Sequence, residues 1–159
     1  MRPGAYFQSA AASILFFASG MTDDLNDGEA QAKQPSAFDL VGGEARVREL
    51  VDRFYDLMDL EPEFAGVRAL HPASLDGSRD KLFWFLCGWL GGPDHYIERF
   101  GHPRLRARHL PFAIASSERD QWVRCMAWAM EDVGLPLALR ERLAVSFFDT
   151  ADWMRNREG

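Results

Sequence analysis

The chain has 159 residues, the length of one domain, and 47% of them are hydrophobic, which is enough to bury a core. The formal net charge of −6 disfavours a protein that binds nucleic acid non-specifically. The two cysteines, Cys87 and Cys125, are too few for a disulfide framework or a four-cysteine zinc site, and we expect them to be buried free thiols. Aromatic residues are abundant, at 12 Phe, 5 Trp and 3 Tyr, which indicates a bulky core or a large, flat, apolar partner.

Residues 1–36 differ from the rest of the chain. An apolar run over residues 10–18 resembles a weak signal peptide and has about half the length of a membrane span. The polar stretch from Met21 to Ser36 carries four acidic residues and is predicted to be disordered. Two interpretations stay open, a cleaved export signal or a start assigned upstream of the true one at Met21. We favour the second, because no disulfide pattern demands an oxidising compartment, and we expect a cytoplasmic protein.

The chain becomes helical in pattern from residue 38. Apolar residues between 44 and 58 recur at the i, i+3, i+4, i+7 spacing of one helix face, after the loop residues Gly42 and Gly43. A turn is expected between residues 61 and 66. A second helical face begins near Leu75 and ends at the stop signal Gly91-Gly92-Pro93.

Helical patterns continue through the second half of the chain. A short basic helix is expected over residues 104–109, and Ser117 with Asp120 resembles the capping box of a long helix that ends at Gly134. A last helix follows, with Pro136 in its first turn and apolar residues from Leu139 to Met154 along one face. Since no stretch alternates with period two for long, the predicted class is all-α, with four substantial helices and several short ones.

The histidines are the residues that suggest chemistry. His95, His102 and His109 are seven apart, but Gly101 and Pro103 interrupt any helix that would align them, so the spacing is weak evidence for zinc. His109 follows three arginines and is flanked by apolar side chains, namely Leu105, Leu110 and Phe112. Haem requires this combination, in which the imidazole ligates iron, apolar groups cover the porphyrin and Arg pairs with the propionates. The alternative is an exposed histidine beside a solvated or RNA-contacting arginine patch, and the acidic net charge disfavours RNA.

Several motifs, in order and with similar gaps, resemble the group II truncated haemoglobins. The resemblance covers residues 38–156. It rests on Gly42-Gly43, Phe54-Tyr55, His71-Pro72, residues 90–93 with Tyr96, residues 101–112, residues 118–122, and Cys125-Met126. It implies a truncated globin fold, a two-over-two helical sandwich, over residues 37–156, with a short tail at 157–159.

The resemblance implies that haem b is the cofactor and that His109 is its proximal ligand. Arg108 and Lys81 match positions that bind the propionates, and Tyr96 reaches a propionate as well. The residues implied to pack on the porphyrin, some of which could equally be plain core, are Phe85, Leu86, Leu105, Phe112, Ile114 and Met126.

On the distal side of the haem, Tyr55 and Trp122 match the two hydrogen-bond donors. Ser78 takes the gate position opposite the iron, and Leu82 lies one turn further on the same side. His71 departs from the family, which usually has Phe or Tyr there. It could donate to the ligand, bond Tyr55, act as a sixth iron ligand or pack on the haem edge. Our hypothesis is that it joins Tyr55 and Trp122 in a polar cluster.

The implied function is a haem protein that binds oxygen, NO or CO at a six-coordinate iron. Two distal hydrogen bonds of about 1–1.5 kcal/mol each would slow ligand release about 30- to 150-fold, which suits redox chemistry or sensing better than bulk transport. The alternative is an enzyme that performs NO dioxygenation or a peroxidase-like reaction, with peroxide as a ligand and an external reductase. A haem-free helical interaction module is disfavoured, because packing alone does not require Tyr55, Trp122 and His109 together.

Fewer sequence features support the predictions about macromolecular partners. We expect no nucleic acid and no membrane as partners, and a homodimer whose surface includes an exposed subset of four tryptophans, Trp84, Trp89, Trp128 and Trp153.

Overall fold

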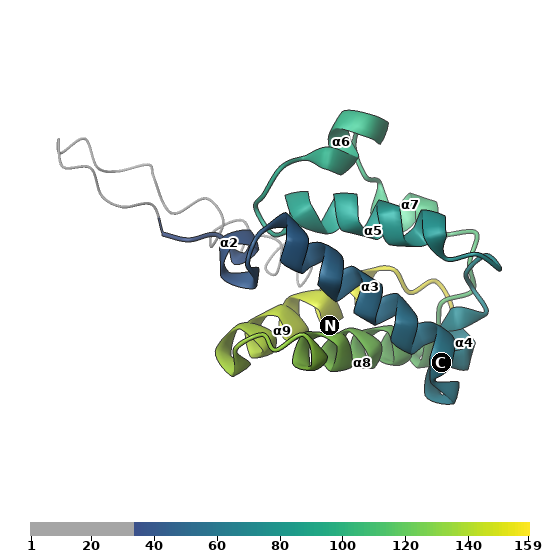
Figure 1. The fold of residues 1–159 in the computed structure, drawn as a ribbon. Helices are drawn as coiled ribbons and strands as arrows, with labels where there is room; N and C mark the ends of the chain where they lie inside the picture. Colours follow the sequence, from purple (N-terminus) through teal and green to yellow (C-terminus); the bar gives the residue numbers. More distant parts are fainter. Residues whose placement is uncertain (1–33) are drawn as a thin grey trace, which may run out of the picture.

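The computed structural model describes residues 34–159, and every regular element in this range is a helix, so the predicted all-α class is confirmed (Figure 1). The predictions of an export signal or an upstream start site lie outside the described residues. The elements are α2 (Ala37–Val41), α3 (Glu44–Leu60), a 3₁₀ turn η1 (Pro62–Phe64), α4 (Ala65–Arg68), α5 (Asp76–Trp89), α6 (His95–Phe100), α7 (Leu105–His109), α8 (Ser116–Asp132) and α9 (Leu137–Trp153).

The four long helices form two layers, as expected for a two-over-two sandwich (Figure 1). Helix α3 packs against α5 on one side and α8 on the other, and α8 packs against α9. The short helix α6 packs against α5. None of the described helices is long and apolar enough to cross a membrane.

The core lies between α3, α5, α8 and α9. The face of α3 predicted from periodicity is buried, with Phe54, Leu50 and Met58 at most 1% exposed. Full burial of such side chains contributes roughly 1.5–3 kcal/mol each. Cys87 and Cys125 are buried and free, as predicted, and the Cys125 thiol donates to the Phe54 carbonyl over 3.2 Å.

Helix α2 was missed by the sequence analysis, since five residues are too few to show periodicity. Ser36, which we placed in the N-terminal extension, is its N-cap, and Ser36 and Asp39 form a reciprocal capping box. The helix ends at Gly42, whose φ of 119° favours glycine.

The capping box predicted at Ser117 and Asp120 is wrong. Helix α8 begins one residue earlier, at Ser116, and the Glu118 carboxylate accepts from the Ala115 amide over 2.9 Å. Ser117 is therefore already helical, and its hydroxyl accepts from the Gln121 side chain. The start is displaced because the Ser116 amide donates to the Gly159 carbonyl, an end-of-chain contact that the local sequence does not reveal.

Candidate functional site

His109 lies in α7, at the C-terminal end of the short basic helix. Its Nδ1 lies 2.6 Å from the Leu105 carbonyl oxygen. A carbonyl only accepts, so Nδ1 carries the hydrogen and Nε2 keeps a lone pair. Metal-binding histidines in proteins are oriented by the same kind of bond on their other ring nitrogen. The half-buried His109 is thus prepared to ligate through Nε2.

Apolar and cationic groups surround this histidine. Leu105 is half-buried, and Phe112 is 42% exposed, so apolar surface lies beside the imidazole. The Arg108 guanidinium lies 5.7 Å from the ring centroid of Tyr96, which in turn packs edge-on against Phe85. The structure therefore brings five of the six predicted cofactor-binding residues to one region, all except Lys81.

The predicted residues of α5 share one face of that helix. Ser78, Leu82 and Phe85 are spaced by four and three residues and are all half-buried. Lys81 is exposed on the same helix. Of the residues for which a plain core role stayed open, Leu86, Ile114 and Met126 are buried.

The distal candidates meet through the ring of Phe54. Tyr55 contacts that ring edge-on at a centroid distance of 4.9 Å, and Trp122 lies 5.1 Å from it. The Tyr55 ring also lies 5.7 Å from the His71 ring. Tyr55, His71 and Trp122 thus belong to one aromatic cluster at the junction of α3, α4 and α8.

The polar groups of Tyr55 and Trp122 make no hydrogen bonds to the described part of the chain. Tyr55 is only 5% exposed, yet its hydroxyl forms no hydrogen bond with any residue between 34 and 159, and neither does the Trp122 indole N–H. Burial raises the pKa of Tyr55 well above its usual range, although the nearby Arg79 opposes the shift. The phenol therefore stays protonated at neutral pH and remains a donor.

His71 is held by the backbone. Its Nδ1 donates to the Val67 carbonyl over 2.9 Å. Burial lowers the pKa of His71, the Val67 bond opposes the shift, and the nearby Arg68 guanidinium lowers the pKa further. A neutral His71 consequently presents an acceptor at Nε2. Of the roles left open for it, the bond with Tyr55 is not formed among the described residues, and donating to a ligand through Nε2 requires protonation.

Comparison with known proteins identifies the family. A family model described as bacterial-like globin matches residues 36–156. The group 2 truncated hemoglobin YjbI of Bacillus subtilis (strain 168) is 41% identical over 115 residues, which are 72% of this chain and 85% of that protein. The chain belongs to the bacterial-like globins, as a truncated haemoglobin of group II. As a globin it is a haem-binding protein with an oxygen-related function.

Solved structures support the same fold. A group II 2-on-2 hemoglobin from the plant pathogen Agrobacterium tumefaciens matches with a TM-score of 0.75 and 40% identity, over 84% of this chain and 100% of that chain. A truncated oxygen-avid haemoglobin from Bacillus subtilis matches with a TM-score of 0.70 and 38% identity, over 77% and 100% of the two chains. The predicted two-over-two globin fold is confirmed.

Two residues near the distal cluster of this globin were not predicted. The Arg79 guanidinium lies 5.9 Å from the Tyr55 ring centroid and pairs with Asp52 and Asp56 on α3. The Gln121 side chain accepts from the Val67 amide over 2.9 Å, and so supports the residue that holds His71. Only the position of Gln121 next to Trp122 could have suggested its role.

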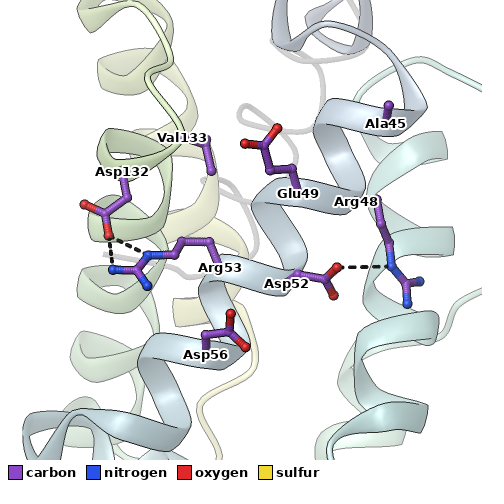
Figure 2. A pocket seen from close by; sticks show the side chains of 8 residues that line it. All are labelled: Ala45, Arg48, Glu49, Asp52, Arg53, Asp56, Asp132 and Val133. Atoms are coloured by element: carbon purple, nitrogen blue, oxygen red, sulfur yellow. Dashed lines mark hydrogen bonds and ion pairs between the residues drawn. The ribbon is translucent and has the colours of Figure 1, made fainter.

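A separate groove of about 720 Å³ lies on the solvent side of α3, opposite the face that carries Phe54 (Figure 2). Its charged side chains are paired with one another or with neighbours, for example Arg53 with Asp132 and Arg48 with Asp52. The groove contains none of the predicted site residues.

Proposed function

We propose that this globin binds haem b through His109 and holds oxygen, or another diatomic such as NO or CO, against Tyr55 and Trp122. Two observations carry the proposal. His109 is a half-buried imidazole with a free Nε2, and Tyr55 is a largely buried side chain whose hydroxyl is accessible and has no partner among the described residues. The similar haemoglobin of Bacillus subtilis described as oxygen-avid supports oxygen as the ligand.

On the proximal side, the Nδ1–H bond to Leu105 orients the His109 ring and makes Nε2 more basic. Haem, when bound, supplies an iron that takes up diatomic ligands reversibly. Arg108 and Lys81 would neutralise the propionates, with Tyr96 beside them, and Leu105 and Phe112 would exclude water from the porphyrin.

On the distal side, Tyr55 and Trp122 donate to the partial negative charge of a bound diatomic. Ser78 is small and leaves the entrance open, with Leu82 one turn further along α5. We propose that the neutral His71 lines the distal side next to the Tyr55 ring and leaves the Tyr55 hydroxyl available to the ligand.

The proposal is tested by titrating the purified apoprotein with hemin and following the Soret band. We expect stoichiometric binding and, after reduction, the spectrum of a histidine-ligated haem. His109→Ala should lose that spectrum, whereas His102→Ala, which changes an exposed histidine outside the helices, should keep it. An unchanged spectrum of His109→Ala would refute the assignment.

The second candidate function is NO dioxygenation or a peroxidase-like reaction, with peroxide as a ligand and an external reductase. Two hydrogen-bond donors to the ligand, from Tyr55 and Trp122, favour slow ligand release, which suits turnover better than transport. Sustained NO consumption in the presence of a reductase would separate this function from simple binding.

The homodimer and the cytoplasmic location stay predictions. All four tryptophans named for a dimer surface are half-buried, so light scattering on the purified protein is the direct test of assembly.

A further inference from the structure

We propose that residues 154–159, called here the C-terminal clamp, hold the proximal loop, residues 109–116, and that Asn156 is the positioning residue that sets where His109 lies. This inference rests on the proposed function in one respect, that His109 is the haem ligand. Asn156 itself has no role in the haem contacts proposed above.

The Asn156 side chain makes three hydrogen bonds to the proximal loop. Its Nδ2 donates to the carbonyl oxygens of His109, over 3.1 Å, and of Phe112, over 2.8 Å. Its Oδ1 accepts from the Ile114 amide over 3.1 Å. Two carbonyls and one amide fix the orientation of the side-chain amide, because only this orientation satisfies all three partners.

The backbone of the clamp adds further bonds to the same loop. The amides of Asn156 and Arg157 both donate to the Ile114 carbonyl, over 2.9 and 3.1 Å, and the Ser116 amide donates to the Gly159 carbonyl over 2.9 Å. The clamp therefore lies along the loop from its histidine to the start of α8.

Helix α7 depends on such bonds, because it has little core of its own. None of its five residues is buried, and the Leu110 side chain that follows is 51% exposed. Its N-cap, Arg104, has a φ of 47°, which costs energy for a residue other than glycine. Hydrophobic packing thus contributes little to the placement of His109, and polar contacts must supply it.

A second contact joins α7 to the clamp. The Arg106 guanidinium donates to the carbonyls of Trp153 and Arg155 and lies 5.3 Å from the Trp153 ring centroid. The Arg155 side chain pairs with Asp152, which also accepts from Arg119 of α8 over 2.7 Å. The clamp is thereby bound to helices α8 and α9 through Arg155 and Asp152, and α7 is bound to the clamp through Arg106.

His109 is therefore held at two groups, its imidazole ring and its main-chain carbonyl. Its ring Nδ1 is bound to Leu105, and its carbonyl is bound to Asn156. Because the strength of an iron–histidine bond depends on the position and rotation of the ring, a change at Asn156 would be transmitted to the iron without any direct contact.

The first test compares Asn156→Ala and Asn156→Asp with Glu158→Gln as a control. The aspartate variant keeps the shape of the asparagine side chain but turns a carboxylate toward two carbonyl oxygens, whereas Glu158 is exposed and takes no part in the bonds to the loop. In the ferrous protein, we expect both Asn156 variants to shift and broaden the iron–histidine stretching band in resonance Raman spectra. Haem transfer to apomyoglobin should accelerate roughly ten- to one-hundred-fold, because Asn156→Asp loses the two donated hydrogen bonds and Asn156→Ala loses the accepted one as well.

The second test separates positioning from general destabilisation. In a His109→Gly background with added imidazole, the iron ligand is no longer attached to the loop. Asn156→Ala should then leave the rate of haem loss unchanged. An equal acceleration in this background, or an unchanged iron–histidine band in the haem-loaded single variants, would overturn the inference.

If the Asn156 variants do not fold, Arg106→Gln removes the second contact between α7 and the clamp, and the same shift and acceleration are expected. The outcomes for the two proposals remain distinguishable. A wild-type protein without a histidine-ligated haem spectrum contradicts the proposed function itself, whereas an unaltered band in a loaded variant contradicts only the role of the clamp.

Discussion

Removing the distal donors one at a time is the sharpest test of the proposed ligand site. In Trp122→Phe the indole N–H is lost, but a ring remains to pack between Phe54 and Phe147, whose centroids lie 5.1 and 5.5 Å from it. In Tyr55→Phe only the hydroxyl is lost. Since neither donor bonds another described residue, neither substitution breaks a protein hydrogen bond.

The magnitude follows from what each donor contributes to the ligand. A hydrogen bond of about 1–1.5 kcal/mol corresponds to a rate change of about 5- to 13-fold. We therefore expect each single variant to release oxygen about 5- to 13-fold faster, and the double variant about 30- to 150-fold faster. The stability of the apoprotein should change by less than about 0.5 kcal/mol for Tyr55→Phe, because the hydroxyl has no protein partner to lose.

The assay is stopped-flow displacement of oxygen by CO, with Trp128→Phe as the matched control. Trp128 packs against Phe64 at 5.0 Å, at a different position along α8, and its substitution should leave the oxygen off-rate unchanged. Equal off-rates for wild type and the double variant would refute the assignment of Tyr55 and Trp122 as ligand donors.

Three further predictions concern the stability of the apoprotein, measured by urea or thermal unfolding. Gly92→Ala should lower the free energy of unfolding by roughly 1–3 kcal/mol, because the added Cβ would lie 2.6 Å from the Phe38 ring. In Gly77→Ala the added Cβ meets no atom within 4 Å, so this variant should be more stable by about 0.4–1 kcal/mol. Equal effects of the two substitutions would contradict the packing described. Arg79→Met should cost about 1–2 kcal/mol, since the 20%-exposed guanidinium binds two carboxylates and a carbonyl on α3, and a cost below about 0.3 kcal/mol would show that these bonds contribute nothing. His71 has a pKa lowered by burial, so the unfolded chain takes up its proton first, and stability should fall as the pH drops below about 6.5. This part of the fall should be absent in His71→Phe, and identical pH profiles would contradict it.

The long helices could be predicted because their apolar spacing reflects a buried face. The face of α3, the loop at Gly42 and Gly43 before it, and the stop at Gly91-Gly92-Pro93 follow from local physics, namely periodicity and turn chemistry. The short helices α2 and α6 could not be predicted, because five or six residues do not display a period.

The site was predictable to a smaller extent. The types and order of Tyr55, Trp122 and His109 indicated haem, and the structure places Tyr55 and Trp122 on one ring. The hydrogen bonds that orient the histidines run to backbone carbonyls, which every residue carries, so no sequence pattern marks them. The role of Asn156 could not be predicted for the same reason, because its partners are main-chain groups 42 to 47 positions earlier in the chain.

The unequal burial of the two halves of the site has a consequence for how the protein acquires its cofactor. Helices α3, α8 and α9 each bury several side chains in the core, whereas α6 and α7 bury no residue. Segments with so few buried contacts open at a much lower free energy than the whole domain. The chain can therefore complete its main fold before haem arrives, and haem can enter or leave through local opening of α6 and α7. The lifetime of the loaded protein is then set by this local opening rather than by global unfolding.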